Sequence, residues 1–249
     1  MEIIIKDDSG QVALATAEMI REQLNKKPAS LICFAAGHTQ RETLELLAEW
    51  YKNGELEFDR CRLIGLDEWV GLAGDLPGTC LHFISENVFK PMDISPERYF
   101  FFDGCTDDLD AQCAAANAYI DRFGPIDLVV LGAGMNAHLG FNEPGVGLDL
   151  RSHVCDLDNT SKTVGTKYFE SSVPLTRGIT LGLRDLLSAG TLILQVTGKH
   201  KVDVVKKICD GEISNMVPAS LTRNHSNAVL LIDTEAAAGI STLAYTGRC

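Results

Sequence analysis

The chain has 249 residues, 45% hydrophobic and 22% charged, and a composition of this kind is ordinary for a soluble globular protein. Its formal net charge of −12 argues against nucleic acid and anionic membrane surfaces as partners, although single loops can still bind a small anion. The eight cysteines form no Cys-x-x-Cys pair, so neither a zinc knuckle nor a thioredoxin-like motif is expected. The N-terminus does not resemble a signal peptide, and no apolar run reaches membrane-spanning length. The reducing cytoplasm is therefore the expected compartment.

Short apolar runs alternate with segments of helical spacing along nearly the whole chain. The predicted strands are Ile3–Ile5, Leu31–Phe34, Leu63–Leu66, Tyr99–Phe102, Ile126–Leu131, Leu192–Val196 and Ala228–Ile232. The predicted helices are Val12–Leu24, Thr39–Tyr51, Thr79–Phe89, Leu109–Phe123 and Lys199–Cys209. Thr39 and Glu42 have the spacing of a capping box at the start of the second helix. This order predicts an α/β fold: a doubly wound, mostly parallel sheet with helices on both faces, in three layers.

The domain organisation follows from what the chain lacks. It contains no internal repeat, low-complexity tract or Pro/Gly/Ser-rich linker, so residues 1–249 are expected to form a single domain. Residues 156–175 differ from the rest, because they are polar, rich in Ser and Thr, and have little apolar periodicity. A long segment of this sort can be a lid over a site, and an ordinary surface loop is the alternative.

The first candidate binding element is the turn after the strand Leu31–Phe34. Gly37 leads this turn into a helix, and a helix N-terminus offers free N–H groups and a positive dipole end that suit a phosphate. Many such turns contain a glycine and bind nothing, so the turn alone is a weak signal.

The second candidate is Asp67, which follows the strand Leu63–Leu66. A carboxylate at the carboxyl edge of a parallel sheet can act as a general base towards a substrate carbon acid. The alternative is an Asp that forms a local turn through its own backbone, as most strand-end aspartates do.

The third candidate is the glycine-rich segment after the strand Ile126–Leu131. Its glycines formally match the dinucleotide pattern G-x-G-x-x-A, but Pro144 and Gly145 would break the helix that this pattern requires. What remains is His138 with Asn136 and Glu143 close by. An imidazole oriented by a carboxylate is a recurring proton-transfer unit.

The fourth candidate is the pair Lys199 and Lys201 at the start of a predicted helix. Cations at this end oppose the helix dipole, and a bound anion would relieve that cost, unless both side chains simply point into solvent. All four loops follow parallel strands, so they should meet at one edge of the sheet. Together they predict a small phosphorylated substrate that undergoes proton transfer, with no metal and no nucleotide cofactor.

Two of these segments resemble motifs of a known family, the amino-sugar-6-phosphate deaminases/isomerases, which are related in fold to 6-phosphogluconolactonases. Leu66–Leu72 resembles the family's "DEYVGL" or "DEWV" motif, and Gly134–Pro144 resembles its "GxNGHIGFNEP" motif. The resemblance runs in order over nearly the whole chain. Pro77–Cys80 and Thr176–Asp185 look closer to the galactosamine-6-phosphate branch than to the glucosamine-6-phosphate branch.

The resemblance implies roles for the candidate residues. Asp67 would move the C2 proton of the sugar towards C1, and His138 would assist ring opening with Glu143 and Asn136 holding it. The residues implied to hold the 6-phosphate are Gly37, His38, Thr39, Lys167 and Lys201. The implied reaction converts galactosamine 6-phosphate, or glucosamine 6-phosphate, to the ketose 6-phosphate and ammonia. It needs no metal or organic cofactor, and a homo-oligomer is left open.

The chain departs from the usual family pattern at several positions. His38 and Gln40 stand where a small residue and a proline are usual, and Asn136, Ala137 and Lys167 stand where Asp, Gly and Arg often occur. Two alternatives stay open: a 6-phosphogluconolactonase-like hydrolase, which would share the fold and a Gly-x-Gly-x-x-x-His loop, and a sugar-phosphate-binding protein without activity, which the departures at His38 and Ala137 suggest. The motifs around Asp67 and Glu143 count against both.

Overall fold

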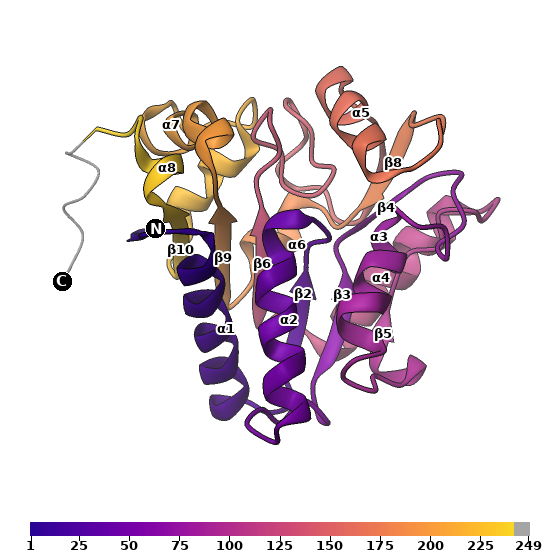
Figure 1. Cartoon of the computed structure of the whole chain (residues 1–249). Helices are drawn as coiled ribbons and strands as arrows, with labels where there is room; N and C mark the ends of the chain where they lie inside the picture. Colours follow the sequence, from indigo (N-terminus) through magenta and orange to yellow (C-terminus); the bar gives the residue numbers. More distant parts are fainter. Residues whose placement is uncertain (242–249) are drawn as a thin grey trace.

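A seven-stranded parallel sheet forms the centre of the protein in the computed structural model, which describes residues 1–241 (Figure 1). The strand order is β1-β10-β9-β6-β2-β3-β5, and every neighbouring pair is parallel. The strands are β1 (Glu2–Lys6), β2 (Leu31–Phe34), β3 (Arg62–Gly65), β5 (Tyr99–Phe100), β6 (Leu128–Gly132), β9 (Thr191–Val196) and β10 (Ala228–Asp233). This architecture confirms the predicted fold class.

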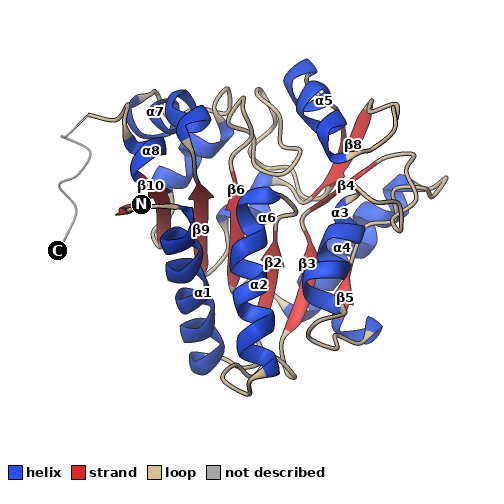
Figure 2. Ribbon diagram, viewed as in Figure 1, coloured by secondary structure: helices blue, strands red, loops and turns tan. Residues whose placement is uncertain are grey.

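Helices cover both faces of this sheet, which gives the three layers (Figure 2). One face packs against α1 (Ser9–Lys26), α2 (His38–Lys52) and α3 (Cys80–Ile84), and the other packs against α4 (Leu109–Phe123), α6 (Leu183–Leu187), α7 (Val202–Asp210) and α8 (Thr234–Ala237). Alternate residues of β2 serve the two cores, because Leu31 and Cys33 join one cluster and Ile32 and Phe34 join the other. No helix within residues 1–241 combines the length and apolar character needed to cross a bilayer.

A small antiparallel sheet, which the sequence pattern did not predict, lies beside the large one. It contains β4 (Asp67–Trp69), β8 (Arg177–Thr180) and β7 (His153–Asp156), in the order β4-β8-β7. The predicted lid segment begins at the end of β7 and contains the short helix α5 (Asn159–Gly165) and a 3₁₀ turn over Thr166–Tyr168. The small sheet therefore holds Asp67 on one edge strand and leads into the segment 156–175 from the other.

The predicted capping box is wrong. Helix α2 begins at His38 with Gly37 as its N-cap, and no side chain caps it. The chain has already turned into the helix at Gly37, so Thr39 lies inside the first turn and cannot serve as the N-cap.

Three other predicted elements are shorter or less regular than expected. β5 ends at Phe100, which pairs with Ile64 of β3, and shortly beyond this point the neighbouring chain leaves the large sheet and enters the small one at Asp67. The predicted helix Thr79–Phe89 is capped by Thr79 but changes from α3 into a π-helical turn at Ser85. The predicted helix Lys199–Cys209 opens with a 3₁₀ turn before α7.

Candidate active site

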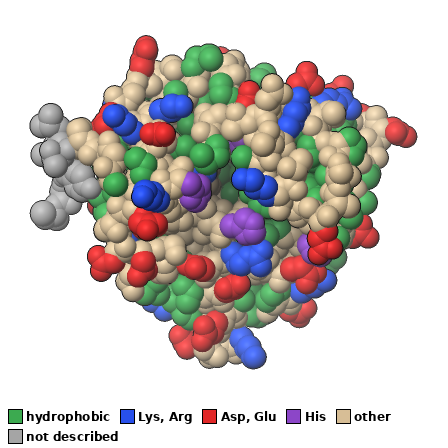
Figure 3. All heavy atoms as spheres, turned by 45° about the horizontal axis from the view of Figure 1, so that its top comes forward, with side chains coloured by type: hydrophobic (Ala, Val, Ile, Leu, Met, Phe, Trp, Pro, Cys, Tyr) green, Lys and Arg blue, Asp and Glu red, His purple; other side chains and the backbone are tan. Residues whose placement is uncertain are grey.

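A cavity of about 640 Å³ lies where the strands β2, β3, β6 and β9 end. Histidine and basic side chains gather around the hollow on this face (Figure 3). The residues predicted from the sequence that line it are Gly37, His38, Thr39, Asp67, His138, Lys167 and Lys201. Asn136 and Glu143 do not line the cavity, since they contact His138 from the side of α5. The structure thus brings together all four candidate loops and places the segment 156–175 against them.

Asp67 lies at the first position of β4, and its residue is 8% exposed. Its Oδ2 lies beside Gly140: a side-chain Cβ at position 140 would be only 3.3 Å from this oxygen. Burial raises the pKa of Asp67 to about 6, although a hydrogen bond with Cys80 and the charge of His138 act in the opposite direction. A carboxyl group with this pKa is ionised at neutral pH and can accept a proton from a substrate.

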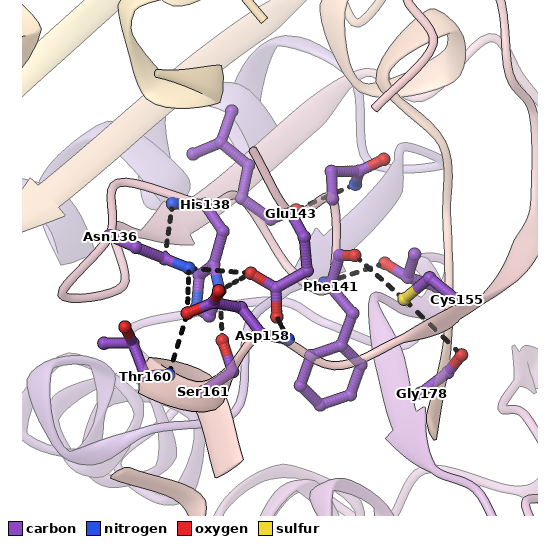
Figure 4. A network of polar contacts seen from close by, with 12 residues as sticks. Asn136, His138, Phe141, Glu143, Cys155, Asp158, Thr160, Ser161 and Gly178 are labelled. Carbon is purple, nitrogen blue, oxygen red and sulfur yellow. Dashed lines mark hydrogen bonds and ion pairs between the residues drawn. The ribbon is translucent and has the colours of Figure 1, made fainter. Parts of the chain in front are cut away.

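His138 is held by a carboxylate that has several hydrogen-bond donors of its own (Figure 4). His138 Nδ1 lies 3.1 Å from Glu143 Oε2, and the amide of Asn136 donates to the same oxygen over 2.8 Å. The backbone N–H of Asp158 donates to the other oxygen, Oε1, over 3.1 Å. Burial acts to raise the pKa of Glu143, but the interactions with His138 and the other donors outweigh it and the pKa is lowered. Glu143 is therefore an ionised acceptor.

An ionised Glu143 determines which nitrogen of neutral His138 carries the proton. Nδ1 donates to the carboxylate, so Nε2 is left with its lone pair. A Cβ built on Gly134 would lie only 2.1 Å from Nε2, which shows that this nitrogen lies over the bare backbone of Gly134 in the cavity wall. Ala137 stands in this loop with φ +65° and no exposed surface, a conformation that usually favours glycine.

A further part of the cavity wall is basic. Helix α2 begins there at His38, and the aromatic ring of Tyr168 stacks on His38 with ring centroids 5.4 Å apart. Lys201 Nζ donates to the carbonyl of Ala133 over 2.6 Å, and burial lowers the pKa of Lys201 to about 8. Lys167 lies on the 3₁₀ turn after α5. A helix N-terminus with two lysines and a histidine around it is suited to a phosphate group.

Sequence reasoning missed three residues of this site: Asp158, Ser161 and Tyr168. Asp158 caps α5 by accepting from Thr160 N over 2.7 Å, and this Asx cap was the one signal that could have located the helix. Within residues 1–241, no group of three or more His, Cys, Asp or Glu side chains is arranged to hold a metal ion.

Comparison with known proteins gives a consistent result. A sequence model of the family described as glucosamine-6-phosphate isomerases/6-phosphogluconolactonase matches residues 7–231. The glucosamine-6-phosphate deaminase of Halothermothrix orenii is 34% identical over 238 residues, which cover 95% of this chain and 99% of that protein. Glucosamine-6-phosphate deaminase 1 of Bacillus subtilis is 34% identical over 239 residues, which cover 95% of this chain and 97% of that protein.

Solved structures show the same similarity. A monomeric glucosamine-6-phosphate deaminase has a TM-score of 0.92 at 32% identity, with 96% of this chain and 100% of that chain covered. The 6-phosphogluconolactonase of Trypanosoma brucei has a TM-score of 0.76 at 20% identity, with 96% and 98% covered, and at this identity it shows the fold alone.

Proposed function

The chain belongs to the glucosamine-6-phosphate isomerase/6-phosphogluconolactonase family, and we propose that it is an amino-sugar-6-phosphate deaminase. The observation that carries the proposal is that one cavity is lined by the buried carboxyl group of Asp67, by His138 with Glu143 bound behind it, and by the basic residues at the start of α2. Its substrate is a hexosamine 6-phosphate, and its products are the ketose 6-phosphate and ammonia.

Ring opening is the first step, and His138 performs it. Nε2 accepts the proton of the O1 hydroxyl while the bond between C1 and the ring oxygen breaks, and the proton then passes to the ring oxygen. Glu143 stabilises the imidazolium that forms in between, because its carboxylate accepts from Nδ1 over 3.1 Å. The product is the open-chain aldehyde with its amino group on C2.

Asp67 then moves one proton along the open chain. Its carboxylate removes the hydrogen from C2 while a proton of the C2 ammonium group passes to O1, which gives an enolamine with a hydroxyl on C1 and a neutral amino group on C2. The same carboxyl group returns the proton to C1, so the nitrogen becomes an imine on C2. Water adds to this imine, and ammonia leaves as the ketone forms, which balances the reaction without an external oxidant or reductant.

Phosphate binding orients this chemistry from a distance. We place the 6-phosphate at the N-terminus of α2, where His38, Lys167 and Lys201 line the cavity, so that it is remote from C1 and C2. Binding energy at a part of the substrate that does not react can position the reacting carbons against Asp67 and His138.

The acid limb of the pH profile should report on Asp67. We expect kcat/KM to fall about tenfold per pH unit below about pH 6, because the pKa of Asp67 is raised to about 6 and only its ionised form removes the C2 proton. Ammonia release between pH 4.5 and 8 measures this. The adjacent carboxyl of Glu68, whose pKa burial raises to about 7, is the control: Glu68→Gln should leave the midpoint near pH 6. A wild-type midpoint below pH 5 would contradict the assignment.

The finer choice of substrate depends on the C4 epimer. Pro77, Gly78, Thr79 and Cys80 line the cavity, and this segment resembles the galactosamine-6-phosphate branch. We therefore expect ammonia from both hexosamine 6-phosphates, with the higher kcat/KM for galactosamine 6-phosphate. A higher value for glucosamine 6-phosphate would reverse the epimer assignment alone. Hydrolysis of 6-phosphogluconolactone without ammonia release from either amino sugar would overturn the proposal in favour of a lactonase.

A further inference from the structure

His138 Nδ1 has a second partner besides Glu143, and this partner lies on the lid segment. Ser161 Oγ lies 3.0 Å from His138 Nδ1, and Ser161 is 4% exposed (Figure 4). Ser161 belongs to α5, 23 positions away from the histidine in the sequence. A helix of the lid segment therefore touches the imidazole directly, on Nδ1, the nitrogen that also contacts Glu143.

The same segment is attached at two further points. At its start, the backbone N–H of Asp158 donates to Glu143 over 3.1 Å, so the lid also holds the carboxylate of the pair. At its other end, Tyr168 stacks on His38, the first residue of α2. Residues 158–168 thus connect the His138–Glu143 pair with the basic part of the same cavity.

We propose that Ser161 is a positioning residue that fixes the orientation and tautomer of His138 when α5 is docked. The hydroxyl oxygen accepts from Nδ1–H alongside Glu143, and the hydroxyl proton remains free to donate to the carboxylate. Two acceptors on one nitrogen hold the ring against rotation and keep the proton on Nδ1. The inference rests on the proposed function, in which Nε2 must be the free nitrogen.

This arrangement gives phosphate binding a route to the catalytic imidazole. A phosphate held by His38 and Lys167 holds the end of the lid segment, since Lys167 and Tyr168 are neighbours on its 3₁₀ turn. A docked lid places Ser161 against His138. Binding energy from the end of the substrate that does not react is thereby used to orient the base.

The test compares side chains at position 161 with a matched control on the same helix. Thr163 is the control, because its hydroxyl donates to Asn159 O within α5, is exposed and does not line the cavity. We expect Ser161→Ala to lower kcat about tenfold with little change in KM, which corresponds to the loss of one hydrogen bond that matters in the transition state. Thr163→Ala should keep the wild-type kcat. Ser161→Thr should restore kcat to within about threefold of wild type.

A second readout does not depend on turnover. In ¹⁵N-histidine-labelled protein, the resonances of His138 report which nitrogen carries the proton in the neutral ring, and their absence from His138→Gln assigns them. We expect nearly all Nδ1–H tautomer in the wild type and a mixture of tautomers in Ser161→Ala. If Ser161→Ala does not fold, Ser161→Thr and Ser161→Val replace it as the comparison. Their side chains have nearly the same volume, and only Ser161→Thr keeps the hydroxyl.

The outcomes separate this inference from the proposed function. If Ser161→Ala or Ser161→Val keeps both the tautomer of His138 and the kcat of the wild type, Ser161 does not position His138. An equal loss of kcat in Thr163→Ala also overturns it, because the effect would then come from the stability of α5. If the wild type releases no ammonia from any hexosamine 6-phosphate, the proposed function fails, while the tautomer measurement still decides whether Ser161 positions His138.

Discussion

Asp67→Asn is expected to lower kcat by about 10²- to 10⁴-fold, the usual contribution of a general base. The amide has nearly the same shape as the carboxyl group, so the fold and the packing against Gly140 should survive. It cannot accept the C2 proton, because the lone pair of its nitrogen is delocalised into the carbonyl group. The substrate should still bind, since the residues proposed to hold its phosphate are unchanged. KM should therefore stay within about threefold of the wild-type value.

Two measurements check this expectation. Steady-state ammonia release gives kcat, and exchange of the C2 hydrogen with deuterated water shows directly whether proton removal has stopped. Asp156→Asn is the matched control, since Asp156 lies exposed at the end of β7 in the same small sheet and outside the cavity. Near-native turnover or exchange in Asp67→Asn would show that another group is the base.

Gly134→Ala is expected to lower kcat by about 10²-fold or more, although it adds only one methyl group. A Cβ at this position would lie 2.1 Å from His138 Nε2 and 2.2 Å from Cδ2, far inside van der Waals contact. The imidazole must then rotate away from Gly134. In the rotated position, Nδ1 cannot keep its bond to Glu143 while Nε2 still points into the cavity. The nitrogen that we propose as the acceptor of the O1 proton is thus displaced, although the histidine itself is unchanged.

Gly147→Ala is the control for this substitution. Gly147 is exposed in the continuation of the same loop, and its added Cβ would meet only Leu150, which is itself 42% exposed. We expect wild-type kcat and thermal stability in Gly147→Ala. In Gly134→Ala we expect the loss of kcat together with a changed ¹⁵N spectrum of His138. Wild-type kcat in Gly134→Ala would mean that the ring has room to move without loss of function.

The large sheet was predictable because its strands are unambiguous in the sequence. Runs such as Leu31–Phe34 and Ala228–Ile232 are continuously apolar, as expected for parallel strands that are covered on both faces. Parallel strands bring the loops at their carboxyl ends to one edge, so the meeting of Asp67, His138 and Lys201 in one cavity could be expected from chain order.

The small sheet and the contacts of the segment 156–175 could not be predicted in the same way. The strands β4, β7 and β8 have three or four residues each and carry charged side chains among apolar ones, which gives no clear period. Their pairing joins Asp67 to Thr180, more than a hundred positions apart, and only tertiary packing decides it. The contact between Ser161 and His138 is of the same kind, since no local pattern relates the two residues.

The small sheet has a consequence for the range of substrates that this architecture can serve. Thr180 on its central strand pairs with Asp67 on one side and with His153 on the other, so β4 and β7 are joined through one residue. Asp67 and the strand that precedes the segment 156–175 therefore belong to the small sheet, whereas Gly37 and His38 follow a strand of the large sheet. Trp69 of β4 packs on Phe141, which lies in the loop between His138 and Glu143, with ring centroids 4.7 Å apart. Under the proposed function, this contact links the strand that carries Asp67 to the loop that carries His138, so we expect its repacking to change the chain length of the sugar phosphates that fit the cavity.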